Sequence, residues 1–234
     1  MHKILRKKIP IYSRFFSVSS VSKCLNLDSK IFISKEQSVD YVKSFVSMCP
    51  EGKIENKRQA AVLIPLCYVN NELSLLYTLR TNNLKRNSGQ VSFPGGMKED
   101  NEDLRLTALR ETCEELGIND NNVEIWGHGK FLLSRDIAIM PFLGNLGNIN
   151  PKKLNVSHKE VQYAFSLPLK HFCEPSNCKY TCFKQKYNRL IVLPVYLNEY
   201  KRIWGMTGYM TWLALCSILP NKFKHRLLTP ITVN

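Results

Sequence analysis

The chain has 234 residues, of which 44% are hydrophobic and 22% are charged, with 11 Gly and 11 Pro. This composition is typical of one folded domain with appended segments, and it excludes wholesale disorder, a collagen and a coiled coil. The formal net charge of +14 leaves three classes open: a nucleic-acid binder, a membrane-surface protein, or an enzyme for anionic substrates that carries a basic leader.

Residues 1–27 form a leader that is basic and rich in serine. The leader contains six Lys or Arg residues and no acid before Asp28, so the remaining chain has a net charge of +8. Basic, acid-free segments with interleaved apolar residues are typical of mitochondrial transit peptides, and the continuous apolar run of a secretory signal is missing. Pro10 would interrupt a helix, so a plain basic arm is the alternative. The leader predicts a location in the mitochondrial matrix.

The rest of the chain reads as a helix with a connector (28–58), a main domain (59–220) and a C-terminal tail (221–234). Apolar runs between turn-forming Asn, Ser and Gly residues predict strands in the main domain. The predicted strands are 60–69, 73–80, 91–93, 123–126, 131–133, 137–143, 161–167 and 187–197. The predicted helices are 38–48, 101–116 and 202–219. Strands on both sides of two helices predict a mixed α/β sandwich.

Neither a membrane-spanning helix nor a zinc site is predicted. No apolar run reaches the roughly 18–20 residues that a spanning helix needs, so membrane insertion is not predicted. The eight cysteines are scattered along the chain, which favours free thiols in a reducing compartment. Cys178 and Cys182 lack CxxC spacing and a second close pair, so aromatic packing in a hairpin is predicted there rather than a zinc site.

The predicted helix 101–116 has an apolar and an acidic face. At about 100° per residue, the apolar arc comprises Leu106, Leu109, Cys113 and Leu116. The opposite arc comprises Glu111, Glu114 and Glu115. Like charges at this spacing cost about 0.2–0.5 kcal/mol per pair, and Arg110 can neutralise only one of them. Either the face is a solvated surface, or it binds Mg²⁺ or Mn²⁺, which prefer hard oxygen ligands and bind substrate phosphates. The glycine-rich loop 93–96, where backbone carbonyls can approach a metal, favours the metal site.

Residues 96–118 resemble the signature of the Nudix hydrolase family, G-x5-E-x7-R-E-U-x-E-E-x-G-U, where U is aliphatic. The matching residues are Gly96, Glu102, Arg110, Glu111, Glu114, Glu115, Gly117 and Ile118. The departure is Thr112, which we expect at the edge of the apolar arc, away from the carboxylates.

The resemblance implies a Nudix-type α/β/α sandwich with a mixed central sheet, and hydrolysis of a diphosphate linked to another moiety. It implies Mg²⁺ or Mn²⁺ bound by Glu111, Glu114 and Glu115, with the Gly96 carbonyl as a further ligand. Glu111 or Glu115 would be the catalytic base, and the sequence does not separate base from ligand. Arg110 would orient a carboxylate, and Glu102 would support the start of the helix.

Residues 76–96 resemble the second motif of the coenzyme A pyrophosphatase branch of this family, approximately L-L-T-x-R-[SA]-x3-R-x3-G-x-V-x-F-P-G-G. The departures are Tyr77, Thr81 and Lys85. Farther along the chain, Ile203–Thr207 is also similar to a segment of this branch. Lys85 keeps the charge of the arginine in the motif but loses its planar fork. Arg80, Lys85 and Arg86 lie close in sequence to the loop that contains Gly95. These three cations predict a substrate-binding wall that contacts a second phosphate; the alternative is that they are solvated loop charges.

Glu160 is either an extra metal ligand or base, or a plain surface residue.

The branch resemblance implies hydrolysis of coenzyme A or acyl-CoA to 3′,5′-ADP and 4′-phosphopantetheine or its acylated form. One alternative is a Nudix hydrolase for another nucleoside diphosphate derivative, such as ADP-ribose or NADH. A second is a non-catalytic RNA-binding Nudix module, motivated by the remaining charge of +8. Because the carboxylates of the signature are intact, no nucleic-acid partner is expected. The oligomeric state, the acyl-chain preference and the choice between Mg²⁺ and Mn²⁺ stay open.

Overall fold

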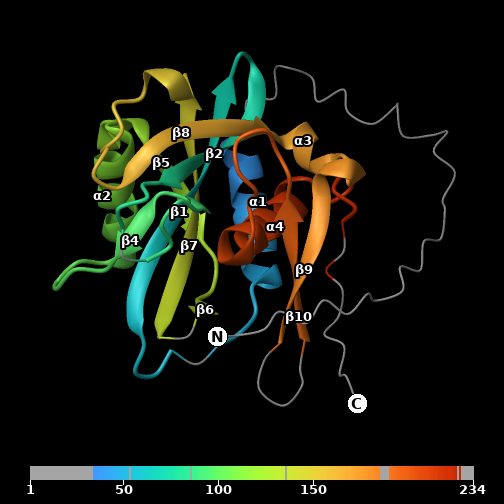
Figure 1. Ribbon diagram of the computed structural model, residues 1–234, viewed down its shortest axis with the longest axis horizontal. Helices are drawn as coiled ribbons and strands as arrows, with labels where there is room; N and C mark the ends of the chain where they lie inside the picture. The colour runs from blue at the N-terminus through green and yellow to red at the C-terminus, as the bar shows by residue number, and fades with distance from the viewer. Residues whose placement is uncertain are drawn as a thin grey trace, which may run out of the picture.

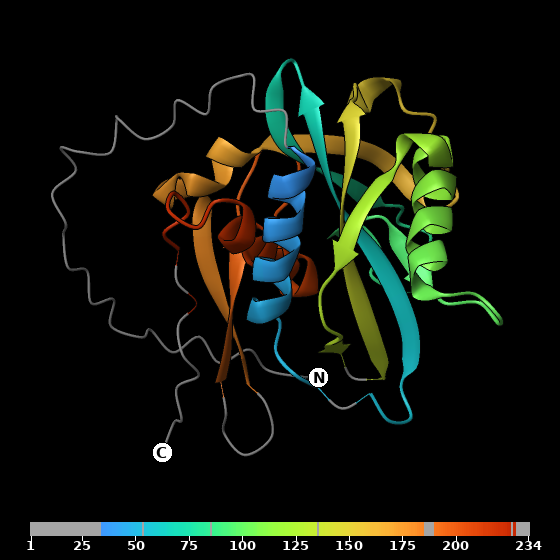
Figure 2. The ribbon, with the colours of Figure 1, turned by 180° about the vertical axis from the view of Figure 1, so that it is seen from behind.

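The computed structural model describes residues 34–52, 54–84, 86–134, 136–184, 190–225 and 227. The leader 1–27, Lys85 and residues 228–234 lie outside the described residues. Figures 1 and 2 show three layers, with a central sheet between α2 on one face and α1 with α4 on the other. These helices are α1 (Lys35–Met48), α2 (Leu104–Leu116) and α4 (Gly205–Ile218). The predicted α/β/α sandwich is confirmed.

The central sheet is mixed, as predicted. Its strands are β1 (Arg58–Val69), β2 (Glu72–Arg80), β3 (Val91–Ser92), β4 (Gly95–Met97), β5 (Glu124–His128), β6 (Leu132–Ser134), β7 (Ile137–Asn148) and β8 (Val161–Pro168). The main path runs β3-β2-β1-β7-β5, with β8 on β2, β4 on β1 and β6 on β7. Only β1 and β7 pair in parallel within the described part of this sheet. The long strand β1 is therefore central in the sheet, and it also pairs with β4, which contains Gly95 and Gly96.

The C-terminal part of the chain forms a separate antiparallel hairpin. The hairpin consists of β9 (Cys178–Lys184) and β10 (Leu190–Tyr196), and it replaces the single predicted strand 187–197. Phe183 stacks on Trp204 with ring centroids 6.3 Å apart, in agreement with the predicted aromatic packing. A short helix, α3 (Leu169–Cys173), links β8 to this hairpin and was not predicted. α4 packs between the sheet and the hairpin (Figure 1).

Strand β4 was also not predicted, because two consecutive glycines give no strand signal. Its backbone pairs with Ala60–Val62 of β1. A Cβ atom on Gly95 would lie 2.3 Å from the Ala61 carbonyl oxygen, and Gly95 has a φ of +149°. Glycine is therefore required where the loop passes closely over β1.

Helix α2 is rotated about its axis relative to the prediction, so it buries a different face. It begins at the N-cap Asp103, whose carboxylate accepts a hydrogen bond from the Leu106 amide at 2.8 Å, and it ends at Gly117 as predicted. Its buried residues are Thr107, Ala108, Thr112, Glu115 and Leu116. Leu106 is 48% exposed, so its assignment to the core face was wrong. Small side chains face the sheet because α2 packs closely on β1 and β4.

Two departures from the family motifs are explained by burial. Thr112 is fully buried rather than at the edge, and its hydroxyl donates to the Ala108 carbonyl at 2.6 Å. Tyr77 is also fully buried, and its hydroxyl bonds with that of Thr211 in α4 at 3.0 Å. Each hydroxyl has a partner, so neither residue leaves an unpaired buried group.

The hydrophobic core has two parts, one on each face of the sheet. The larger part lies beneath α1, α3, α4 and the hairpin and includes Phe45, Tyr77, Phe93, Phe172 and Tyr196. The smaller part lies beneath α2 and includes Leu63, Leu76, Ala108, Leu116 and Phe142. No helix in the described part of the chain is long and apolar enough to span a membrane.

Candidate active site

Arg110, in the middle of α2, is the centre of a network of ion pairs. Its Nε donates to Glu102 at 2.9 Å, and its Nη1 donates to Glu111 at 3.0 Å and to Glu114 at 3.3 Å. The hydrogen bond from Arg110, helped by one from the Thr107 hydroxyl, lowers the pKa of Glu102 to about 2. Arg110 therefore fixes several carboxylates at once, and the expectation that it neutralises only one of them was wrong.

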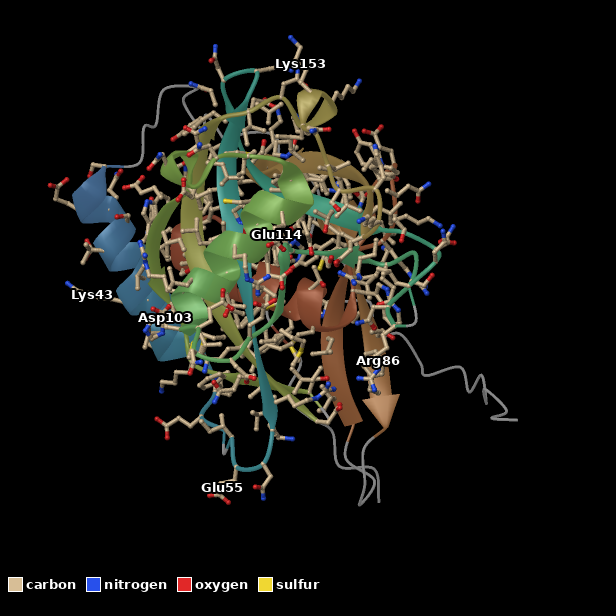
Figure 3. All side chains as sticks on the ribbon, turned by 90° about the vertical axis from the view of Figure 1, so that its left-hand side faces the viewer. Lys43, Glu55, Arg86, Asp103, Glu114 and Lys153 are labelled. Carbon is tan, nitrogen blue, oxygen red and sulfur yellow. The ribbon has the colours of Figure 1, made fainter. Side chains whose placement is uncertain are left out.

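The three glutamates of the predicted acidic face lie in different environments. Glu114 has a side chain that is 61% exposed, and Figure 3 shows it on the outward face of α2. Glu111 is mostly buried, and Glu115 is only 2% exposed. The rotation of α2 explains this difference, because it turns Glu115 toward the sheet and Glu114 toward solvent.

Glu115 is an acid whose two carboxylate oxygens are buried without a hydrogen-bond partner. Burial is the largest cause that raises the pKa of Glu115 to about 8; Arg80 opposes the shift, and the charges of Glu111 and Glu160 add to it. A buried carboxylate without hydrogen bonds is unfavourable by several kcal/mol unless a cation compensates it. The arrangement is typical of a functional site rather than of a structural ion pair.

The glycine loop places its backbone against these carboxylates. A Cβ atom on Gly96 would lie 2.3 Å from one carboxylate oxygen of Glu111 and 2.6 Å from the other. Only a residue without a side chain leaves room for Glu111 here. Gly96 and Glu111, both predicted site residues, are therefore brought together.

Arg80 and Glu160 complete this group from the other side. The guanidinium of Arg80 lies 3.8 Å from Glu115 and 3.9 Å from Glu160, and its Nε is buried without a hydrogen-bond partner. Thr81, a departure from the motif, holds the loop of Glu160: its amide donates to the Glu160 carbonyl at 2.8 Å and its hydroxyl to the Lys159 carbonyl at 3.3 Å. Glu160, whose side chain is 49% exposed, thus lies beside Arg80 at the edge of this group.

Arg86, the other described cation of the predicted wall, pairs with a different acid from Arg80. Arg86 is 71% exposed and lies 3.7 Å from Asp136, which also accepts a hydrogen bond from Arg58 at 3.0 Å. Figure 3 shows Arg86 well to one side of α2. Lys85 lies outside the described residues. Arg80 therefore lies at the carboxylates and Arg86 pairs with Asp136, while both line the same cleft.

This cleft has a volume of about 450 Å³ and lies on β1 and β7. Its polar side is formed by Arg80, Gly95 and Gly96. Its apolar side is formed by Trp204, Met206 and Met210 at the start of α4. The site residues of α2 lie behind the glycines, so a ligand in the cleft would have its anionic part at the polar side.

The apolar side of the cleft contains residues that were not predicted to belong to the site. The sequence showed a similarity between Ile203–Thr207 and the coenzyme A pyrophosphatase branch, which was the available signal. It gave no way to place this segment opposite Gly95, more than 100 positions earlier in the chain. The contact depends on the packing of α4, whose Thr207 hydroxyl donates to the Val91 carbonyl at 3.2 Å.

The donors at this site fit a hard divalent cation. Among the described residues, no three acidic, His or Cys side chains are arranged as a ready metal-binding group. The oxygens of Glu115 nevertheless lack hydrogen-bond partners, with the Arg80 guanidinium 3.8 Å away as their cation, and Glu111 lies against the glycine backbone beside them. Carboxylate and carbonyl oxygens are the ligands that Mg²⁺ and Mn²⁺ prefer. Glu111, Glu115 and the Gly96 carbonyl would hold such an ion, with Glu114 and Glu160 at the margin.

Comparison with known proteins gives the family. Residues 57–169 match the model of the NUDIX domain. The chain is 40% identical over 174 residues to the Mus musculus protein named mitochondrial coenzyme A diphosphatase NUDT8, covering 73% of this chain and 83% of that protein. It is 39% identical over 171 residues to the Homo sapiens protein of the same name, covering 72% of each. It is also 31% identical over 238 residues to Nudix hydrolase 3 of Caenorhabditis elegans, covering 91% of this chain and 98% of that protein. The chain therefore belongs to the Nudix hydrolase family.

Proposed function

We propose that the chain hydrolyses the diphosphate of coenzyme A or acyl-CoA, giving 3′,5′-ADP and 4′-phosphopantetheine or its acylated form. The observation that carries the proposal is the buried carboxylate of Glu115, which lacks a hydrogen-bond partner and lies beside Arg80 behind the polar side of the cleft. The second motif lines the same cleft with Arg80, Gly95 and Gly96. The similarity to two proteins named as coenzyme A diphosphatases supports this choice of substrate.

Each site residue has a role that follows from its position. Divalent metal dependence is typical of the family, and bound Mg²⁺ or Mn²⁺ would neutralise the diphosphate and help to activate water. Glu111 and Glu115 would hold the cation, and one of them would accept the proton of the attacking water. Arg110 positions Glu111 through its hydrogen bond of 3.0 Å. Gly96 leaves room for that carboxylate.

Two cations contact the substrate in this proposal. Arg80 faces the polar side of the cleft, and its unpaired Nε can donate to a diphosphate oxygen. Arg86 lies at the mouth, where its exposed guanidinium can bind the 3′-phosphate of coenzyme A. Lys85 would add charge beside it, as the second motif implies.

The context of the reaction is part of the same proposal. We assign catalysis to residues 59–220, with α1 as a cover that packs on α4. We place the protein in the mitochondrial matrix, which the basic leader and the names of the two relatives support. Coenzyme A or an acyl-CoA would be the small-molecule partner, without a nucleic acid.

The test compares kcat/KM for coenzyme A, its 3′-dephospho form, NADH and ADP-ribose, each with Mg²⁺ and with Mn²⁺. We expect coenzyme A to be preferred and the dephospho form to lose affinity, because it lacks the phosphate that Arg86 would bind. Product analysis in ¹⁸O water identifies the bond that is cleaved and the phosphorus that is attacked. A preference for ADP-ribose or NADH would refute the coenzyme A assignment. RNA binding with a steep salt dependence and no hydrolysis would refute catalysis itself.

A further inference from the structure

A second, smaller pocket adjoins the apolar side of the cleft. It has a volume of about 200 Å³ and shares one residue, Met206, with the cleft. Its other hydrophobic lining residues are Pro50, Phe131, Leu132, Leu133 and Tyr209. Met206 therefore lies between the two spaces, at the first turn of α4.

The walls of this pocket come from three separated segments. Leu132 and Leu133 belong to β6, whose next residue, Ser134, lines the cleft itself. The connector after α1 closes the pocket from the outside: a Cβ atom on Gly52 would lie 2.7 Å from a methyl carbon of Leu133. The connector and α4 both lie outside residues 57–169, so this pocket is built largely beyond the family match.

The pocket presents hydrocarbon to a ligand. Its one charged lining residue, Glu51, is 88% exposed and pairs with Lys130 at 3.0 Å, so its charge faces the rim. Aliphatic groups dominate the remaining surface. Such a lining offers few hydrogen bonds to the polar edge of a nucleobase, whereas burying an alkyl chain gains about 0.8 kcal/mol per methylene. Met206 is unbranched and flexible, so it can move aside or pack along such a chain.

We propose that this pocket receives the acyl chain of an acyl thioester substrate, and that Met206 sets the acceptable chain length. The inference rests on the proposed function and specifies its substrate. The diphosphate lies at the polar side of the cleft, and the rest of the ligand extends past Trp204 and Met206. An acyl group at its end then enters the adjoining pocket. The half-exposed Leu133 becomes part of a binding surface.

The experiment measures kcat/KM for coenzyme A and for its acetyl, butyryl, hexanoyl and octanoyl thioesters. For the unmodified chain we expect about a fourfold rise per buried methylene until the pocket is full, from the same 0.8 kcal/mol. Met206→Trp should flatten this rise, measured as the ratio of kcat/KM for each thioester to that for coenzyme A in the same variant, because Met206 also lines the cleft. Val39→Trp, at an exposed site on α1, is the matched control and should keep the full rise.

A second variant guards against loss of folding. Leu133→Lys places a charge at a side chain that is already 38% exposed, so the fold should tolerate it, and the charge should disfavour long acyl chains selectively. If kcat/KM does not depend on chain length, or if both variants affect every substrate equally, the pocket assignment is wrong while the proposed function stands.

A binding measurement separates the two proposals. Calorimetry with the Glu115→Gln variant compares coenzyme A and octanoyl-CoA without turnover. We expect octanoyl-CoA to bind at least tenfold more tightly, and Met206→Trp in the same background to remove the difference. If the unmodified chain hydrolyses neither ligand yet this difference is found, the proposed function fails and the pocket stands. Equal affinities for both ligands would overturn the pocket.

Discussion

The two sides of the cleft are built by different physical means. On the polar side, charged groups are held by short hydrogen bonds, as in the contacts of Arg110 with Glu102 and Glu111. On the apolar side, Trp204, Met206 and Met210 are positioned by the packing of α4. Directional bonds fix a charged site for chemistry, whereas the non-directional packing of a flexible Met206 allows ligands of different sizes. The comparison predicts large catalytic losses from polar-side changes and smaller, graded effects from the α4 side.

The largest expected effect is that of Glu115. Glu115→Gln removes either a metal ligand or the base, so kcat should fall by about 10²- to 10⁴-fold in a steady-state assay. Glu114→Gln is the matched control on the same helix. Because Glu114 is 61% exposed, its loss should cost less than about tenfold. Equal losses in the two variants would show that burial does not separate their roles.

Arg110 should have the next largest effect. Arg110→Lys keeps the charge but loses the planar fork that contacts Glu102 and Glu111 together. We expect kcat/KM to fall about 10- to 100-fold, the usual range for residues that orient metal ligands. Arg105→Lys, an exposed change on α2, should leave kcat/KM unchanged. A comparable loss in Arg105→Lys would point to a general effect on the helix.

The buried carboxylate also predicts how pH affects stability. The pKa of Glu115 is about 8 in the folded chain against 4.5 for an unperturbed glutamate, so the folded state binds the extra proton. Without metal, the stability that this group contributes is fully present below pH 4.5 and is lost as the pH rises to about 8.

Urea unfolding in EDTA between pH 5 and 8.5 tests this direction. The Glu115→Gln variant should flatten the dependence, and Mn²⁺ should restore stability at pH 8. Glu102, with its pKa of about 2, gives the opposite slope only below pH 4.5, outside this window. Stability that rises with pH in the unmodified chain, and not in the variant, would contradict the burial of Glu115.

The smallest effect is expected at the buried contact between β2 and α4. Tyr77→Phe removes the hydroxyl that bonds with Thr211, which still donates to the Thr207 carbonyl at 2.9 Å. We expect the free energy of unfolding to fall by about 1 kcal/mol in a denaturant titration. Tyr200→Phe, at a side chain that is 38% exposed, is the control and should change it less. An unchanged value for Tyr77→Phe would show that this bond does not hold α4.

The element types were largely predictable from the sequence, and the rotation of α2 was not. Apolar runs located β1, β2, β7 and β8, because a buried strand needs such residues wherever it lies in the sheet. The apolar residues of α2 gave its position in the chain but indicated the wrong buried face. Ala108 and Thr112 face the sheet since a close approach to the glycine strand β4 selects small side chains over large ones.

The sequence by itself determined the family, the sandwich and the chemical types at the site, because the spacing from Gly96 to Gly117 lies within one loop and one helix. Local spacing fixes which residues share a face but not where that face points. Only the tertiary structure decided that Glu115 is buried, that Glu114 is exposed and that Arg86 pairs with Asp136 whereas Arg80 pairs with Glu115. It alone joined residues 50–52, 131–133 and 206–209 into one pocket. Contacts between distant segments depend on how helices pack on the sheet, and no local pattern encodes that packing.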